Sequence, residues 1–444
     1  MNNYKACVVP AALMMGLASA AHALELDLGL GARTDYHSNI LRTEHDAKSD
    51  VERAVILEPG LKQLTGPLTA DMQYRATYLD YLHDVESDTT QVEGRSNIQW
   101  AMLPERFNWI INHQLTDRLT DTRLPDIAQN RERRSVLTGG FDWILALGKV
   151  DSLIVSPRYV DVSFQGNNGA DSKRKQGTMI WEHDFSAVSR LQTSANYAKA
   201  EFDDSTNNYN NKSALISYLT ELSRLTYQIG GGYNRIERDS GDNFDGYTAR
   251  AGADYHADIL TFGGSLVRQL TDTSIGLSGV ELQVPNFESR DSNFDQPSIV
   301  ERTQAEIHAD KQLGLSSHLA AGLNYSDDDY QPPVLRHEKR HGVSLSYDYT
   351  VNSRWSMRLA SAYTLTNADD GSVSTRYRDL ETDATLRYAM SHKVDVNFKL
   401  ASFRRRSDGN SSGVAVGGSF APGSGVSIES YTDNVASIEI MTRF

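Results

Sequence analysis

Apolar and polar residues alternate one by one in short segments that recur along nearly the whole chain of 444 residues. In one such segment, residues 68–78, every second position is apolar and most positions between are polar or charged. A side-chain period of two is typical of a β-strand with one apolar and one polar face. Each segment covers about ten residues, the length that a tilted strand needs to cross a bilayer. The periodicity therefore predicts an all-β fold with many strands.

The connections between these segments alternate between short turns and longer polar stretches. Short turns lie at residues 65–67, 103–106, 147–151, 186–189, 221–224, 256–258, 312–317, 350–353 and 390–393. A solenoid would instead show a recurring residue consensus. Short turns at one end and long loops at the other are typical of outer-membrane barrels. We therefore expect a transmembrane antiparallel up-and-down β-barrel of about 20 strands (18–20), with short periplasmic turns and long extracellular loops.

The last residues of the chain form a regular alternating strand. Ala436, Ile438, Ile440, Thr442 and Phe444 share one face. Chain ends usually fray unless they are paired. We expect the last strand, with Ile438, Ile440 and the terminal Phe444, to pair with the first strand and close the barrel.

The first residues have the features of a secretory signal. Lys5 precedes an apolar run over 7–20, and Ala21, His22 and Ala23 fit a small-x-small cleavage pattern. The alternative is a buried first helix. We expect residues 1–23 to be a cleaved signal peptide and 24–444 to form a single barrel. Cleavage would remove Cys7, the one cysteine of the chain, so closure of the sheet would have to replace disulfides.

Composition agrees with a barrel and excludes some other classes. Mean hydropathy is −0.48 and 39% of residues are hydrophobic. A helical membrane protein is excluded, because no apolar stretch after the first 25 residues is long enough for a spanning helix. In a barrel every second residue faces the lumen, so the average hydropathy looks soluble. The net charge of −14 speaks against nucleic acid as a partner.

All five tryptophans lie close to the short turns. An amphipathic ring prefers the depth of the lipid headgroups, so this clustering predicts an aromatic girdle at the periplasmic membrane surface. The alternative is that turns of any β-protein have aromatic residues nearby. The girdle residues are Trp100, Trp109, Trp143, Trp181 and Trp355.

Charged residues of both signs occupy the polar face of the expected strands. Charges inside a barrel imply water or ion pairs, because an unpaired buried charge is too costly. A barrel of this strand number is wide enough for an aqueous passage. The expected lumen-lining residues are Glu25, Asp27, Arg33, Asp71, Arg75, Arg95, Glu182, Arg250, Asp254, Arg302, Glu306, Arg358, Glu381, Asp383, Arg387, Asp395 and Lys399.

Basic clusters lie where the long loops meet the strands, at the expected outer rim. Their charges could contact lipopolysaccharide phosphates or line an entrance for an anionic polymer. Ordinary contacts with lipid phosphates and general surface charge are the alternative. The residues are Arg131, Arg133, Arg134, Lys173, Arg174, Lys175, Lys339, Arg340, Arg404, Arg405 and Arg406.

No motif in the sequence points to an enzyme, a metal or a cofactor. His308, His318, His337, His341 and His392 are scattered, without a nucleophile elbow or an HExxH sequence nearby. Catalysis assembled from distant strands stays open as an alternative. Acidic clusters at 237–246 and 326–330 lack the ligand spacing of an EF-hand loop, so we interpret them as solvated loops.

Two prolines fall inside expected strands. Pro59 and Pro157 each remove one donor from the hydrogen-bond ladder. β-Bulges near the rim could accommodate them.

Residues 34–62, "TDYHSNILRTEHDAKSDVERAVILEPGLK", resemble the segment that follows the first strand in the β-barrel porin 2 family, where an "sNI/L…sD…PGL" pattern occurs. The hairpin spacing and the terminal Phe444 are also similar, so the resemblance covers the whole mature chain. It implies an association with exopolysaccharide synthesis and export. It supplies no catalytic or binding residues.

These observations predict an outer-membrane channel of a Gram-negative cell, for exopolysaccharide export or passive diffusion of polar solutes. Expected partners are outer-membrane lipid, lipopolysaccharide, the barrel-assembly machinery through the C-terminal strand, and a polysaccharide export apparatus. One alternative is an outer-membrane enzyme acting on lipid or polysaccharide. Another is a sealed structural or adhesive barrel whose lumen is filled by ion pairs.

Overall fold

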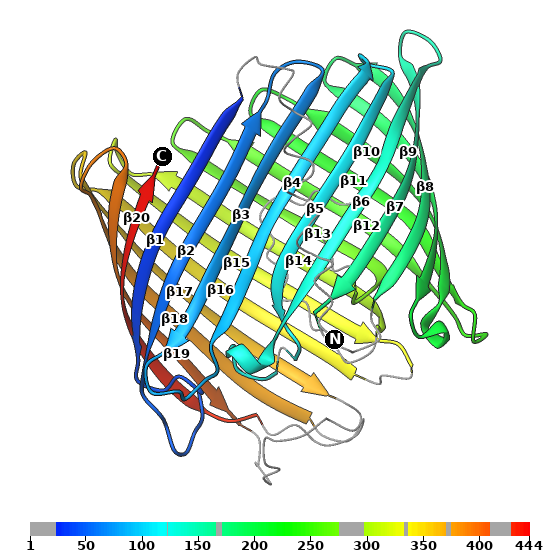
Figure 1. The fold of residues 1–444 in the computed structure, drawn as a ribbon. Coiled ribbons are helices and arrows are strands. Elements are labelled where there is room, and N and C mark those ends of the chain that lie inside the picture. The colour runs from blue at the N-terminus through cyan, green and yellow to red at the C-terminus, as the bar shows by residue number, and fades with distance from the viewer. Residues whose placement is uncertain are drawn as a thin grey trace.

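The chain forms one antiparallel sheet of 20 strands that closes on itself (Figure 1). The computed structural model describes residues 24–121, 123–165, 171–274, 297–332, 336–369, 374–408 and 428–444. The predicted fold class is therefore confirmed, whereas the predicted signal peptide lies outside the described residues. The strands are β1 (Glu25–His37), β2 (Asp50–Gln63), β3 (Leu68–Tyr81), β4 (Thr89–Leu103), β5 (Phe107–Leu119), β6 (Arg131–Ala146), β7 (Asp151–Phe164), β8 (Ser172–Ser186), β9 (Ser189–Phe202), β10 (Tyr209–Glu221), β11 (Leu225–Arg238), β12 (Asn243–His256), β13 (Leu260–Asp272), β14 (Ile299–Gln312), β15 (Ser317–Tyr330), β16 (Arg336–Thr350), β17 (Trp355–Asp369), β18 (Ser374–Ala389), β19 (Val394–Ser407) and β20 (Tyr431–Arg443).

Helical structure in the described residues is restricted to two single turns. They are the 3-10 helices η1 (Ala128–Asn130) and η2 (Ser205–Asn207), both in connections between strands. Within the described ranges, no helix has the length and apolarity required to cross a membrane.

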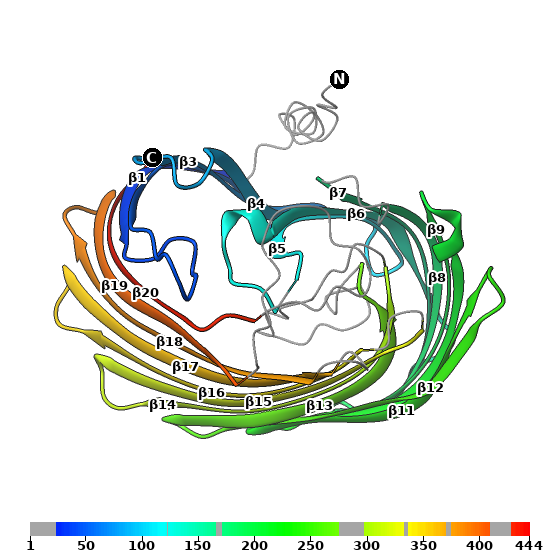
Figure 2. The same cartoon turned by 90° about the horizontal axis from the view of Figure 1, so that it is seen from below.

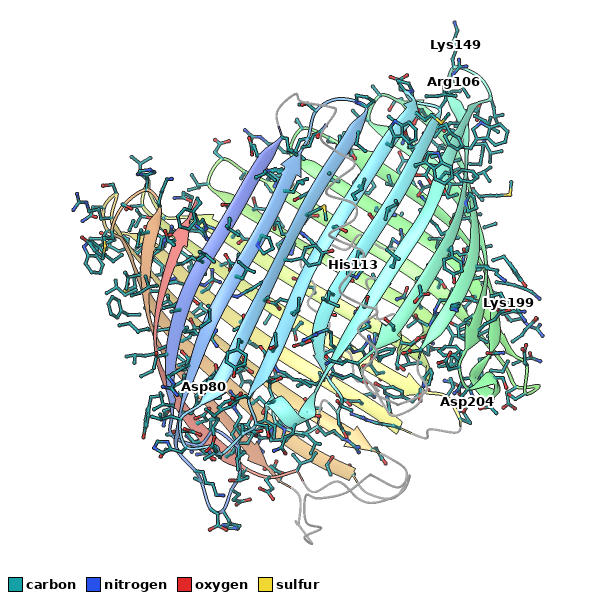
Figure 3. All side chains as sticks on the ribbon, viewed as in Figure 1. Asp80, Arg106, His113, Lys149, Lys199 and Asp204 are labelled. Carbon is teal, nitrogen blue, oxygen red and sulfur yellow. The ribbon has the colours of Figure 1, made fainter. Side chains whose placement is uncertain are left out.

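The connections at one end of the barrel are all short, and most of those at the other end are longer, although 239–242 at the loop end has only four residues. The short connections are 64–67, 104–106, 147–150, 187–188, 222–224, 257–259, 313–316, 351–354 and 390–393, at the predicted turn positions. Arg106 and Lys149 mark this short-turn end in Figure 3, and Asp204 marks the opposite, loop end. The strands contain between 13 and 16 residues, more than the ten or so that the periodicity indicated.

The first and last strands lie side by side and close the barrel. β1 and β20 pair in antiparallel register from Gly29–Arg443 to His37–Val435. The backbone N–H of Phe444 continues this ladder and donates to the carbonyl oxygen of Leu28 at 3.0 Å. The predicted closure by the last strand is confirmed.

The closed sheet has an apolar exterior face and a polar interior face. Residues paired directly on neighbouring strands share a face, and Ile307, Leu323 and Val343 form one such row across β14, β15 and β16. Leu323 is 50% exposed, and its two neighbours are exposed to a similar degree. On the other face, Arg75 of β3 pairs with Glu439 of β20 across two intervening strands, at 3.2 Å. Such a contact is possible only on the concave side of the wall, so this face is the interior.

The prolines interrupt the ladder without shifting its register. Pairing between β2 and β3 is missing beside Pro59 and resumes in the same register, and the β6–β7 ladder behaves likewise beside Pro157. The suggested bulges at these prolines were therefore wrong. The register shifts that do occur lie between Ala101 and Leu103 and between Asp184 and Ser186, next to short turns. Each proline keeps its pairing with the strand on its other side, which holds the register.

The loop end of β13 leaves the wall and turns into the interior. Its ladder with β12 ends at Ala249–Arg268, whereas its ladder with β14 continues to Asp272–Ile299. The side-chain amide of Asn234, on the interior face of β11, donates to the carbonyl oxygen of Leu270 at 2.6 Å. In the view along the barrel, the described parts of the connections after β1 (blue) and after β5 (cyan) also lie within the outline of the wall (Figure 2).

Candidate functional site in the barrel interior

A buried ion pair holds the inward-turned end of β13 against β8. The Arg174 guanidinium contacts the Asp272 carboxylate at 2.7 Å, and their side chains are only 4% and 3% exposed. Arg174 also donates to the hydroxyl of Tyr209 at 2.6 Å. Tyr209 and Ser274 both donate to the Asp272 carboxylate. Side chains from β8, β10 and the end of β13 therefore satisfy one another inside the barrel.

Two further arginines bind the backbone immediately after β13. Arg118 of β5 donates to the carbonyl oxygen of Thr273 at 3.2 Å, and Arg134 of β6 donates to that of Ser274 at 3.5 Å. Both arginines are buried. Because β5, β6, β8 and β10 all contact residues 272–274, the chain crosses the interior at this point.

A second interior network joins β14, β15 and β16. Arg302 contacts Asp328 at 2.5 Å and 3.1 Å, and Arg340 contacts Glu338 at 2.5 Å and Asp328 at 3.6 Å. Arg336 donates to Glu338 as well. Both carboxylates are almost fully buried, so their charges are balanced by arginine rather than by bulk water.

A third network ties two connections to the wall. Arg405 of β19 pairs with Asp379 of β18 at 2.7 Å and donates to the carbonyl oxygen of Arg123 at 2.5 Å. Arg123 and Asp121 lie in the connection after β5. Burial opposes ionisation of the Asp121 carboxyl, but its contact with Arg123 at 2.6 Å holds the pKa of Asp121 below its ordinary value. Asp433 accepts from the backbone N–H of Asn39 at 3.1 Å and thereby anchors the connection after β1.

Nearer the short-turn end, two charged cavities line the interior. A cavity of about 790 Å³ is bordered by five carboxylates and two arginines among its charged residues, namely Asp254, Glu306, Asp310, Glu381, Asp383, Arg250 and Arg358. A neighbouring cavity of about 550 Å³ is bordered mainly by cations, with Arg33, Arg358, Arg387 and Lys399 against Asp348 and Glu439. Arg358 borders both cavities, so an acidic and a basic wall meet there.

The register places all residues proposed for the lumen on the interior face. Directly paired residues share a face, so the interior face can be followed from Arg33 to Glu439 and from strand to strand around the closed sheet. Several of them join in pairs, such as Arg75 with Glu439 and Arg387 with Asp395 at 2.8 Å. Their part in solute passage stays a prediction.

The basic residues proposed for the outer rim divide between the two faces. Arg131, Arg133, Lys173, Lys175, Lys339, Arg404 and Arg406 lie on the exterior face. Arg134, Arg174, Arg340 and Arg405 face the interior instead, because adjacent residues of a strand point to opposite faces. For these four, the interior direction contradicts contact with lipid phosphates, whereas a role in lining an entrance stays a prediction.

The five tryptophans lie on the exterior face at the short-turn end. Trp100 of β4 pairs directly with Trp109 of β5, and Phe107 pairs with Trp143 of β6. Aromatic pairs on other strands at this end include Tyr218 with Tyr227 and Trp355 with Tyr388. A position at the membrane surface stays a prediction.

Sequence reasoning missed the acidic partners Asp272, Asp328, Glu338, Asp379 and Asp433. Each lies in the half of its strand nearer the loop end. No group of three or more potential metal ligands occurs among the described residues.

No known protein family and no curated protein matches the chain. Solved structures with a similar fold include the FrpB iron transporter from Neisseria meningitidis (F3-3 variant), with a TM-score of 0.49, 8% identity, and coverage of 96% of this chain and 82% of that one. The siderophore receptor PirA from Pseudomonas aeruginosa has a TM-score of 0.47 and 10% identity, covering 95% and 80%. OccAB3 from Acinetobacter baumannii has a TM-score of 0.41 and 9% identity, covering 95% and 100%. Likenesses of this degree say nothing about what this chain binds.

Proposed function

We propose that the chain is an outer-membrane channel for polar solutes. The observation that carries the proposal is a closed wall with an apolar exterior that surrounds charged interior cavities of about 790 and 550 Å³. A wide exposed apolar surface needs lipid or another apolar partner, and a closed barrel satisfies its backbone groups without water. Under this proposal the cell is Gram-negative, and residues 1–23 direct export and are cleaved. Lipid and lipopolysaccharide surround the exterior, and the barrel-assembly machinery recognises β20.

Planar-bilayer conductance tests the channel. The purified protein is expected to give discrete current steps, because the interior charges keep water in the passage. A bilayer that stays silent at several protein concentrations would contradict the proposal. It would favour a sealed barrel, in which the interior ion pairs serve only stability.

Charge selectivity gives a sharper prediction. Asp254→Asn with Asp383→Asn is expected to shift permeability toward anions, and Lys399→Gln toward cations. One charge about 8 Å from an ion in water contributes about 0.5 kcal/mol, or about a two-fold change in permeability ratio. The measurement is the reversal potential in a salt gradient. Asp245→Asn is the matched control, because Asp245 lies on the exterior face beside Tyr233 and should leave the ratio unchanged.

For the solute, we propose a hydrophilic polymer, in line with the resemblance of residues 34–62 to barrels associated with exopolysaccharide export. The cavity that combines Arg33, Arg387 and Lys399 supports an acidic polysaccharide, because guanidinium and ammonium groups bind carboxylates. Added polyuronate oligosaccharides are expected to block single-channel current, and neutral dextran fragments of equal length to block it less. Equal block by both would remove the preference for an acidic polymer.

A further inference from the structure

Three polar side chains form a hydrogen-bonded relay along the exterior face of the wall, from β3 to β6. The His113 ring on β5 contacts the hydroxyl of Ser135 on β6 through Nε2 at 3.0 Å. Through Nδ1 it contacts the hydroxyl of Tyr74 on β3 at 2.7 Å. The Tyr74 and His113 rings are also stacked, with centroids 5.9 Å apart.

The register fixes this relay on the outside of the barrel, away from the interior cavities. Trp109 and Ile111 alternate with interior residues on β5 and are exposed, and His113 continues their face. Ser135 shares that face because it pairs with Leu115. Figure 3 labels His113 in the middle of the wall, well below the short-turn end. Polar groups that face lipid are expensive, so their presence indicates a function more often than at a wet surface.

Gly94 permits the contact between strands that are not neighbours. β4 lies between β3 and β5, and Gly94 pairs with Tyr74 on one side and with Leu115 on the other. A Cβ atom at Gly94 would lie 2.5 Å from Cδ1 of Tyr74 and 2.5 Å from the backbone carbonyl oxygen of Gln73. Glycine therefore leaves room both for the β3 backbone and for the tyrosine ring to lie across β4 and reach His113.

The geometry points to a membrane-facing acyl-ester hydrolase in which Ser135 is the nucleophile, His113 the general base and Tyr74 the positioning residue. Nucleophilic catalysis requires a nucleophile hydrogen-bonded to one ring nitrogen of the base and an orienting group hydrogen-bonded to the other, and this arrangement has both. With its proton on Nδ1, His113 donates to Tyr74 and accepts from Ser135 through Nε2. This inference rests on the proposed membrane location.

The reaction balances with water as the only co-reactant. Ser135 Oγ bonds to the acyl carbon while the bond from that carbon to the lipid alcohol oxygen breaks. The serine proton passes to His113 Nε2 and from there to the departing alcohol. Water then attacks the acyl-serine, His113 takes its proton and returns it to Ser135, and a fatty acid leaves.

The surroundings of Ser135 indicate the substrate class. Toward the short-turn end its strand continues on the exterior with Leu137, Phe141 and Trp143, whereas the next exterior residue toward the loop end is Arg133. Arg133 reaches over β5, where it contacts the Asp117 carboxylate at 3.4 Å, and donates to the carbonyl oxygen of Thr90 at 2.5 Å. Ser135 therefore lies where the exterior changes from apolar to charged, with Arg133 beside Asp117. An acyl chain would lie along the apolar side, and the lipid phosphate would lie beside Arg133.

The test measures fatty-acid release by the full, detergent-solubilised protein from mixed micelles. One arm contains phosphatidylethanolamine and the other contains lipopolysaccharide, which distinguishes the two sources of ester-linked acyl chains. Release is expected in at least one arm. Ser135→Ala is expected to lower it about 1,000-fold or more, and the double variant Ser135→Ala/His113→Ala no further, because the two residues act as a unit. Ser163→Ala is the matched control, because Ser163 is the exterior neighbour of Ser135 on β7.

Tyr74→Phe tests the positioning of the ring. It is expected to shift the pH–rate profile and to lower the rate about ten-fold, while the compact electrophoretic mobility of the unheated barrel is kept. Wild-type release that is absent in both arms, or equal to that of Ser135→Ala, would overturn the hydrolase. Conductance of the same preparation separates the two proposals, because current steps without hydrolysis would remove the hydrolase and leave the channel.

Discussion

Arg174→Ala is expected to destabilise the folded barrel by about 3–5 kcal/mol, because it leaves the Asp272 carboxylate buried without its cation. Tyr209 and Ser274 continue to donate to that carboxylate, but neither supplies positive charge. The measurement is the free energy of unfolding from urea titration in lipid vesicles, followed by tryptophan fluorescence.

The double variant Arg174→Ala/Asp272→Ala provides the control. It removes both charges and is expected to be more stable than Arg174→Ala alone, since no unpaired ion remains. A double variant as unstable as the single one would mean that packing of the arginine stem, and not the ion pair, holds β13 inside the barrel.

Leu323→Lys is expected to destabilise the barrel by about 2–4 kcal/mol if the exterior faces lipid, because a lysine near the middle of the membrane loses its hydration. Leu323 is half exposed between Ile307 and Val343 on the exterior face. The measurement is again urea unfolding in vesicles.

Ser344→Lys is the matched control at similar depth. Ser344 follows Val343 on β16 and lines the acidic interior cavity, where a lysine finds water and carboxylates. We expect a change of less than about 1 kcal/mol. Equal destabilisation by the two lysines would contradict a lipid-facing exterior, and with it the proposed membrane location.

Local patterns in the sequence were enough to predict the barrel. The alternation over residues 68–78 indicates which side chains share a face, and polar turn residues such as those at 65–67 indicate where a strand reverses. The strand at 436–444 predicts closure, because an alternating segment at a chain end needs a partner. Each of these signals is contained in a short stretch of neighbouring residues.

The interior networks required information that no local pattern carries. The segments "KRK" at 173–175 and "RRR" at 404–406 were each treated as one patch, although alternation turns Arg174 and Arg405 inward. The partner of Arg174, Asp272, is 98 residues away in the sequence. It becomes a neighbour only because β13 leaves the wall.

The exterior relay was missed for a related reason. Tyr74, His113 and Ser135 lie on three strands and form no motif of fixed spacing. The barrel register places Tyr74 and Ser135 in one row and His113 one exterior position away on β5, and the space above Gly94 allows the contact. One signal could have drawn attention to the relay. Gly94 lies on the apolar face of an alternating segment, and Tyr74 lies opposite it on the adjacent strand.

The departure of β13 from the wall also determines where the barrel loosens first. On the loop side of Ala249, residues 243–248 of β12 keep their ladder with β11 but have no ladder with β13. Local unfolding begins where backbone hydrogen bonds are fewest. Amide hydrogens of 243–248 should therefore exchange with deuterium before those of 250–255, in a mass-spectrometric time course, and this edge of β12 should be the first place where solvent enters the wall.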